Sequence, residues 1–407
     1  MLPLDGVRVL ELANVLAGPF CGYHLARLGA LVIKIENPRG GDLARRLGAD
    51  PEMARRSMGL SFVAVNAGKQ SVAVDLKHPR GQQIFRQLSA QVDVIVENFR
   101  PQVMERLGLG YDVLAADNPR LIYCAVSGFG QTGPWARRPA YDQIVQGLSG
   151  AMSVTGDTRA APLRAGFPIS DTIGGLTAAF AISAALVEQR RTGRGRFIDV
   201  SLLEATVAAM GWVVSNYLNG GVAPEPMGNE NYTAAPSGTF RTATGPLNIA
   251  ANEQRQFEAL CDLIGRSDLK LDPRFADRQA RRENRAALGA LIETQLDGRS
   301  AEEWETLLNH HGVPAGRVLT VPDVLAHPQL HDRAFVEWLP IDGSRGERLR
   351  VTRPGFRFQE GFPPPAAPPA LGSETRVWIE RLGYGTGEIE ALARDGVVAI
   401  GGAGDGP

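Results

Sequence analysis

The first 127 residues alternate short apolar segments with longer helical patterns, and this alternation limits most strongly which folds the chain can adopt. Short runs of Val, Ile and Leu are typical of buried strands. Strands joined through helices favour a parallel sheet with helices on both faces. We therefore predict a doubly wound, Rossmann-like α/β domain. The expected strands cover residues 7–12, 31–36, 71–76, 92–97 and 121–126, with a helix at 79–90.

The ends of these strands predict where a ligand binds. In open parallel sheets, ligands bind beyond the carboxyl ends of the strands. The loops expected at that edge are 14–19, 36–39, 75–77, 98–101 and 127–133. No Gly-x-Gly-x-x-Gly follows the first strand, and the P-loop motif is absent from the sequence. These absences argue against a dinucleotide-dependent dehydrogenase.

The remaining chain indicates a second, smaller unit, because 407 residues exceed one typical domain. A stretch rich in Gly, Pro and Asn at 221–232 reads as a linker. Beyond it the patterns predict a hairpin within 239–251 and three helices. The Pro-rich segment 362–369 reads as a stiff connector. In the second unit the expected helices are 253–264, 281–296 and 301–310. After the connector, helices are expected at 374–382 and 388–394, and 401–407 is expected to be a frayed tail.

Composition limits which cellular compartment and which binding partners we expect. A net charge of −1 argues against a nucleic-acid binder. Cys21, Cys124 and Cys261 stand in apolar contexts, which suits reduced thiols rather than disulfides or a metal site. Charged and polar residues interrupt every apolar stretch before it reaches membrane-spanning length, and Met1 leads straight into the first strand without a secretory leader. We expect a cytoplasmic protein with no membrane contact and no metal.

Asp171 is the most informative single residue. It precedes a long Ala-rich segment, 172–187, which predicts a buried helix with Ser170 or Asp171 at its N-cap. Such an aspartate often does no more than cap its helix. However, Gly174 and Gly175 would leave the first turn bare, so that another molecule could approach closely. A carboxylate kept ionised by a helix N-terminus beside an open groove suits a nucleophile.

Several motifs along the chain match one family in order. They cover residues 3–395 and include Leu4-Asp-Gly-Val-Arg-Val-Leu-Glu-Leu, Leu16-Ala-Gly-Pro-Phe, Leu28-Gly-Ala-Leu-Val-Ile-Lys-Ile-Glu, Val96-Glu-Asn-Phe-Arg-Pro, Gly128-Phe-Gly-Gln-Thr-Gly-Pro and Thr192-Gly-Arg-Gly. On these motifs the chain resembles the class III coenzyme A transferases of the CaiB/BaiF type, which include formyl-CoA, carnitine and succinyl-CoA:dicarboxylate transferases.

The resemblance implies roles for particular residues. Asp171 matches the family's nucleophile, and backbone amides near Gly174 and Gly175 are candidate oxyanion donors. The positions implied to hold substrate or CoA are Val15, Leu16, Val74, Asp75, Leu76, Lys77, Asn98, Phe99, Arg100, Arg106, Leu107, Arg138, Tyr141, Gly174 and Gly175. Leu16 replaces a Gln found in some members, and the formyl-specific Gly-rich loop is absent.

The resemblance also implies the architecture and the reaction. A large domain would be formed by residues 1–220 and 333–407, with the linker and small domain at 221–332, and two chains would interlock as a homodimer. Coenzyme A thioesters would be substrates, with no permanently bound cofactor. CoA would move, through an aspartyl-CoA thioester, from a donor expected to be succinyl-CoA to a small acid. Itaconate, glutarate, malate, citramalate and mesaconate fit equally well, and Arg164 is one candidate for the distal carboxylate.

Two alternatives stay open at this point. The α-methylacyl-CoA racemases share the fold and the Asp171 position, but they carry a catalytic His where this chain has Tyr141. A tyrosine is a poor base near neutral pH. The second alternative is a non-catalytic CoA-binding protein, which would not need Asp171.

Overall fold

The computed structural model describes residues 1–401 and divides into two compact units. The first unit contains Met1–Ala151, Arg164–Val222 and the chain from Asp332 onward. The second contains Ala223–His331 and also the loop Met152–Leu163, which the sequence does not assign to it. The amide of Gly228 donates to the carbonyl of Gly156 at 2.7 Å, which ties this loop to the second unit. Most of the predicted tail, from residue 402, lies outside the described residues.

A seven-stranded sheet forms the centre of the first unit, in the order β12-β3-β2-β1-β4-β5-β6. Its strands are β1 (Arg8–Leu12), β2 (Leu31–Glu36), β3 (Gln70–Val74), β4 (Val94–Glu97), β5 (Ile122–Ser127), β6 (Phe197–Ser201) and β12 (Val398–Ala399). All neighbours are parallel except β12, which pairs antiparallel with β3. The predicted doubly wound fold is confirmed. The strand order reverses between β1 and β4, which is where such folds open a ligand crevice.

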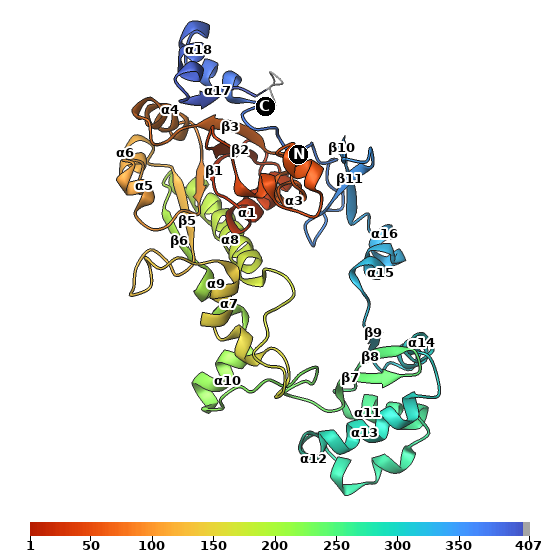
Figure 1. Cartoon of the computed structure of the whole chain (residues 1–407). Helices are drawn as coiled ribbons and strands as arrows, with labels where there is room; N and C mark the ends of the chain where they lie inside the picture. The colour runs from red at the N-terminus through yellow and green to blue at the C-terminus, as the bar shows by residue number, and fades with distance from the viewer. Residues whose placement is uncertain (402–407) are drawn as a thin grey trace. The chain divides into compact units, whose positions relative to one another are not determined.

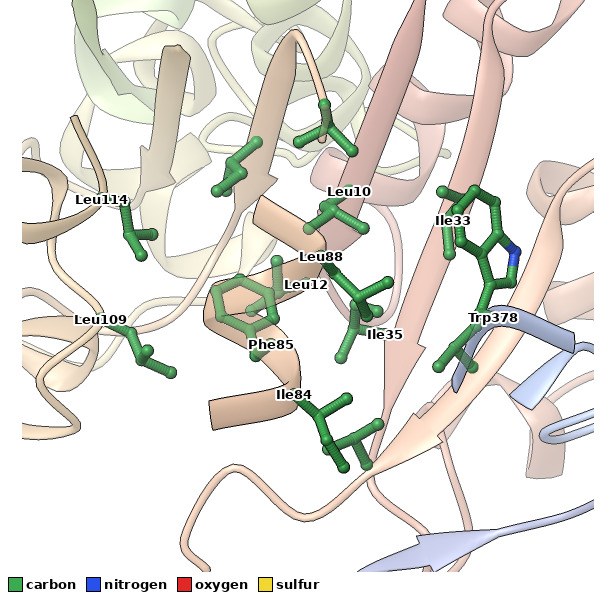
Figure 2. Packing of buried hydrophobic residues seen from close by; sticks show 14 of the residues in the cluster. Leu10, Leu12, Ile33, Ile35, Ile84, Phe85, Leu88, Leu109, Leu114 and Trp378 are labelled. Carbon is green, nitrogen blue, oxygen red and sulfur yellow. The ribbon is translucent and has the colours of Figure 1, made fainter. Parts of the chain in front are cut away.

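One face of the sheet is covered by helices from both ends of the chain (Figure 1). These are α4 (Pro79–Ser89), α5 (Val103–Arg106), α6 (Tyr111–Asp117), α17 (Thr375–Arg381) and α18 (Thr386–Arg394). Figure 2 shows Leu10 and Ile33 of the strands packed with Phe85 and Leu88 of α4 and with Trp378 of α17. Burying these apolar side chains supplies the main driving force for this layer. The C-terminal helices are therefore part of the large unit's core.

The opposite face is covered by α1 (Ala17–Arg27), α7 (Asp142–Leu148), α8 (Ile169–Thr192) and α9 (Leu202–Ala209). Val9 and Val96 of the sheet pack with Leu25 of α1 and Ile182 of α8. Both α1 and α8 return from the carboxyl edge of the sheet, so they run parallel and begin at that edge.

Helix α8 corrects one expectation from the sequence. Its 24 residues are long and apolar enough, by length and composition, to cross a membrane, whereas no such stretch was predicted. In the structure 44% of its most apolar window is buried, where it packs on α1, α9 and the sheet.

The first unit also contains a hairpin and short helices that sequence patterns did not indicate. The hairpin, β10 (Val336–Asp342) and β11 (Arg348–Thr352), buries Leu339 and Val351 against Tyr23 of α1 and Val63 of α3. The remaining elements are η1 (Leu43–Arg46), α2 (Pro51–Arg55), α3 (Leu60–Asn66) and α10 (Trp212–Gly220).

The second unit is a small α+β fold. Its antiparallel sheet consists of β7 (Ser237–Thr242), β8 (Gly245–Ala250) and β9 (Ala315–Arg317), so the predicted hairpin is confirmed. The expected helix at 281–296 is divided into α12 (Arg278–Glu283) and α13 (Arg285–Leu296), because Asn284 between them has the non-helical angles φ −105° and ψ 23°. The other elements are η2 (Ala151–Val154), α11 (Gln254–Leu263), η3 (Ser267–Lys270), η4 (Pro273–Phe275), α12 (Arg278–Glu283), α13 (Arg285–Leu296), α14 (Ala301–His310), α15 (Val321–Ala326) and α16 (Pro328–Asp332).

Candidate active site

The loops after β1 and β4 meet at the point where the strand order reverses. The amide of Asn14 donates to Oδ1 of Asn98 at 2.9 Å, and Nδ2 of Asn98 donates back to the Asn14 carbonyl at 2.9 Å. This reciprocal pair places the neighbouring candidates Val15 and Leu16 beside the loop that carries Phe99 and Arg100. The structure therefore brings these two groups of predicted residues together.

Exposed cations surround the same edge of the sheet. Lys77, Arg100 and Arg106 are exposed, and within residues 1–401 none of them forms an ion pair. Arg39, in the loop after β2, reaches Asp75 in the loop after β3, with 3.2 Å between Nη2 and Oδ2. Unpaired cations are the groups that bind phosphate oxygens. Arg39 was not among the predicted site residues, although its loop was expected at this edge.

The remaining predicted CoA positions have mixed environments. Val74 is buried in the core, so its side chain faces away from solvent, and Leu76, Phe99 and Leu107 pack partly against the same core. Asp75 orders its own loop, because its Oδ1 accepts from the Lys77 amide at 2.9 Å. In the loop after β5, the Arg138 guanidinium lies 4.9 Å from the centre of the Trp135 ring and stays exposed.

Asp171 lies in the first turn of α8. The helix begins at Ile169 with Pro168 at the N-cap position, so the prediction that Ser170 or Asp171 caps the helix is wrong. The cap comes instead from Asp142 of α7, whose Oδ1 accepts from the amides of Ser170 at 2.8 Å and Asp171 at 3.3 Å. A carboxylate from another helix thus satisfies the free amides of α8.

Gln146, one turn after Asp142, fixes this arrangement. Its Nε2 donates to Oδ2 of Asp142 at 2.6 Å, and its Oε1 accepts from the Ala165 amide at 2.9 Å. Both side chains are buried, with 8% and 1% exposure. Tyr141 directly precedes Asp142, at the N-cap position of α7, and is 73% exposed. Local sequence patterns give no signal for such a cap, because it joins two different helices.

The side chain of Asp171 is left free for chemistry. It is half-buried, and within the described residues 1–401 it forms no hydrogen bond or ion pair. Burial, and then the nearby charge of Asp142, raise its pKa from 3.8 to about 7. A carboxylate desolvated in this way is more basic and more nucleophilic than one in water.

Gly174 and Gly175 allow close packing of neighbouring helices, so the expectation that they leave the first turn of α8 bare is wrong. Both are buried. A Cβ on Gly174 would overlap Leu202 of α9, and one on Gly175 would lie 2.6 Å from the Ala17 carbonyl oxygen of α1. Their amides lie beyond the first turn and are used by the helix itself.

The contact at Gly175 has a second consequence. Asp171 is one turn before Gly175 on the same face of α8, and Gly175 touches the start of α1. Because α1 and α8 run parallel, Asp171 lies one turn before this contact, on the side from which α1 begins. No side chain among the described residues caps α1, whose third helical position is Pro19. The start of α1, with its free backbone amides, therefore packs on α8 one turn after Asp171.

A search against models of protein families matches residues 4–375 to the model described as CoA-transferase family III. The chain belongs to CoA-transferase family III. It is 37% identical to succinyl-CoA:glutarate CoA-transferase of Mus musculus, over 98% of this chain and 91% of that protein. It is 38% identical to succinyl-CoA–D-citramalate CoA-transferase of Chloroflexus aurantiacus, over 97% and 98% of the two chains. A CaiB/BaiF family protein of Brucella suis has a similar structure, with 37% identity and a TM-score of 0.81 over 94% and 99% of the two chains.

As a CoA-transferase, the protein uses CoA thioesters as substrates. Within residues 1–401 the His, Cys, Asp and Glu side chains form no group of three that could hold a metal ion. The three cysteines are buried and unpaired.

Proposed function

We propose that this CoA-transferase moves CoA from succinyl-CoA to a small dicarboxylate, with Asp171 as the nucleophile. The observation that carries the proposal is the Asp171 carboxylate itself, which is half-buried, has no partner within residues 1–401 and lies one turn before the contact of Gly175 with the uncapped start of α1. Relatives named for glutarate, citramalate and mesaconate support a dicarboxylate acceptor. Among these acids and itaconate or malate, no residue of the site favours one.

The reaction follows from the chemistry of a carboxylate nucleophile. An oxygen of Asp171 attacks the thioester carbonyl, and CoA leaves as a thiolate, giving a mixed anhydride with succinyl. The thiolate then attacks the Asp171 carbonyl, so that succinate leaves and an aspartyl-CoA thioester remains. The acceptor carboxylate attacks that thioester and expels CoA as a thiolate, which gives a second mixed anhydride. The thiolate then attacks the acceptor's acyl carbon, so that the new acyl-CoA forms and the Asp171 carboxylate is released. Each step exchanges one acyl bond for another, so no redox group is required.

The environment of Asp171 suits these steps. Each addition to a carbonyl creates a negative oxygen, which free amides at a helix N-terminus can stabilise. The amides at the start of α1 are such donors. The unpaired Lys77, Arg100 and Arg106 are suited to the phosphates of CoA.

Trapping the covalent intermediate tests the role of Asp171. Borohydride added together with succinyl-CoA should inactivate the enzyme and reduce the Asp171 side chain to an alcohol, detected by peptide mass spectrometry. Borohydride alone should not. Asp171→Ala should lose transfer while keeping its fold. A matched control is Asp277→Asn, because Asp277 also lies at a helix start, where it accepts from the Ala280 amide. Full transfer by the Asp171→Ala variant would refute the proposal.

A panel of acids tests the substrate. Succinyl-CoA would be incubated separately with glutarate, citramalate, mesaconate, itaconate, malate, oxalate, carnitine and formate, and the CoA products identified by mass spectrometry. We expect products from one or more dicarboxylates. Acceptance of monocarboxylates alone would overturn the dicarboxylate proposal without affecting CoA transfer. Racemisation of a 2-methylacyl-CoA, measured in the same preparation, would favour the isomerase alternative, against which Tyr141 argues.

We also propose a homodimer. Large apolar side chains are exposed on α8 and α10, where they have no cover from the chain itself. They are Leu176, Phe180, Val187, Trp212, Tyr217 and Leu218, each at least 48% exposed. Exposed apolar surface of this kind is typical of subunit interfaces. The interlocked form follows from the family resemblance.

A further inference from the structure

Four charged side chains lie buried beneath the loop between β1 and α1. They are Glu11 of β1, Lys34 of β2, Asp42 at the cap of η1 and Lys69 just before β3, with exposures of 0%, 0%, 0% and 4%. The Lys34 ammonium lies 2.9 Å from Oε1 of Glu11 and 2.9 Å from Oδ2 of Asp42. Lys69 lies 2.7 Å from Oε2 of Glu11. Asp42, Lys34, Glu11 and Lys69 thus alternate in sign along a buried chain with no net charge, which we term the buried quartet.

The buried quartet binds the backbone of the loop above it. Lys34 donates to the Ala13 carbonyl at 2.6 Å, and Lys69 donates to the Pro19 carbonyl at 2.9 Å. The amide of Val15 donates to Oδ1 of Asp42 at 3.0 Å. Charges that solvent does not reach therefore hold the loop at Ala13 and Val15 and the first turn of α1 at Pro19.

The conformation of Val15 requires such support. Its φ is +68°, in the left-handed region, which a β-branched residue adopts only at a cost. Strained backbone persists where surrounding contacts determine it. At Val15 the contact that does so is the hydrogen bond from its amide to Asp42. The local sequence alone would favour a different path into α1.

This loop sets where α1 begins. Residue 15 is separated from Ala17, the first residue of α1, by Leu16 alone. The start of α1 in turn touches Gly175, one turn from Asp171. A rotation at Val15 would therefore move the uncapped amides of α1 relative to the Asp171 carboxylate.

We propose that Asp42, held in place by Lys34, is a positioning residue that aligns the start of α1 with Asp171. Its hydrogen bond from the Val15 amide holds the left-handed backbone conformation of that residue, and Asp42 itself does not contact the substrate. This inference rests on the proposed role of Asp171. It assigns the buried quartet a purpose beyond stability, since a buried ion pair contributes little net stability compared with apolar side chains of similar size.

Two double variants compare the protein with and without the acceptor that Asp42 offers to the amides of Val15 and, in η1, Ala44. Lys34→Met/Asp42→Asn and Lys34→Met/Asp42→Ala both remove one positive and one negative charge, so neither leaves an unpaired ion at these two positions. Asn keeps an oxygen that accepts from the Val15 amide, whereas Ala does not. We expect the Ala variant to have a kcat about tenfold to a hundredfold below that of the Asn variant, because small displacements near reacting atoms slow reactions by such factors. The KM for succinyl-CoA should change less than threefold.

A second ion pair provides the stability control. Arg27, at the other end of α1, lies 2.6 Å from Glu337 of β10 and is similarly buried. Arg27→Met/Glu337→Gln should lower the Tm without the loss of kcat. Equal kcat values in the two Asp42 double variants, or a kcat loss in the control that follows its Tm, would overturn the inference. A wild-type protein without CoA transfer would instead refute the proposed function.

Amide hydrogen exchange gives a readout that needs no activity. In the wild-type protein and the Asn variant the Val15 amide should be protected, and in the Ala variant it should exchange at least tenfold faster. Should both double variants fail to fold, the wild type alone decides: strong protection of Val15 supports the inference, and exchange at the rate of a free amide overturns it.

Discussion

At the scale of single residues, the half-buried Asp171 meets two opposing demands. It has to be ionised to act as a nucleophile, yet burial and the Asp142 carboxylate both favour its protonated form. Asp142 is nevertheless required, because its Oδ1 accepts from the amides of Ser170 and Asp171 and so orders the start of α8. The same carboxylate therefore positions the nucleophile and sets the pH at which it works.

The pH dependence of the reaction should reflect this balance. The pKa of Asp171 near 7 predicts that kcat/KM rises with pH through about 7, as the carboxyl group loses its proton. Asp142→Asn keeps an acceptor for the two amides but removes a negative charge, so the rise should move to lower pH. Steady-state kinetics from pH 5 to pH 9 would measure it. A rise that stays at the same pH in the variant would contradict the influence assigned to Asp142.

The raised pKa also predicts a stability effect. Because the pKa of Asp171 is higher in the folded protein than in the unfolded chain, the folded state binds more protons between pH 3.8 and about 7. Ionising Asp171 therefore destabilises the fold, fully above about pH 7 and not at all below about 3.8. Asp171→Asn removes this penalty. At pH 8 the variant should exceed the wild type by about 1–3 kcal/mol in unfolding free energy, after allowance for solvent at a half-buried group. Urea unfolding at pH 4 and pH 8 would test it, and a pH-independent difference would argue against burial as the cause.

At the scale of elements, the packing of α1 on α8 should be sensitive to one methyl group. The Cβ of Gly175→Ala would lie 2.6 Å from a backbone oxygen of α1, which cannot rotate away. We expect a loss of about 1–3 kcal/mol in stability and a lower kcat, since α1 would shift beside Asp171. Gly174→Ala is the matched comparison, because it meets the flexible side chain of Leu202. Thermal unfolding and kinetics of the pair would show whether backbone or side-chain obstruction matters more.

Sequence patterns predicted the elements whose signal is local. The runs Val94–Glu97 and Ile122–Ser127 are apolar up to their last residue, and Ser300 with Glu303 has the capping-box pattern that marks the start of α14. The strand Phe197–Ser201 was missed, because its exposed and charged residues weaken the apolar signal at the sheet's edge. Strand Val398–Ala399 has only two residues and exists through its pairing with β3.

Residues of the site could be predicted only where neighbouring residues in the sequence mark them. Asp171 stood out from its position before an apolar helix, but its cap by Asp142 depends on two helices meeting in space. Glu11 and Lys34 are also informative in the sequence, since each is a charged residue between apolar residues of a strand. A charge at such a position requires a buried partner. The identity of that partner depends on the strand order, which periodicity does not give.

At the scale of the whole molecule, the exposed apolar side chains of α8 and α10 predict how the protein assembles. Phe180→Glu/Trp212→Glu places charges where both side chains are more than 75% exposed. We expect a smaller species than the wild-type dimer in light scattering after size-exclusion chromatography. Leu271→Glu is the control, because Leu271 is 87% exposed on the second unit and should not alter assembly. A wild-type monomer at micromolar concentration would refute the dimer.

Strand β12 closes the sheet next to β3, and this pairing has a consequence for synthesis on the ribosome. The two strands are separated by about 320 residues, which take roughly 15–60 s to translate. During that interval the nascent chain exposes the hydrogen-bonding edge of β3 and the apolar surface later covered by Trp378. The sheet of the first unit is therefore complete only after Trp378 and β12 have been synthesised. We expect the protein to aggregate when the 3′ end of its coding region is truncated.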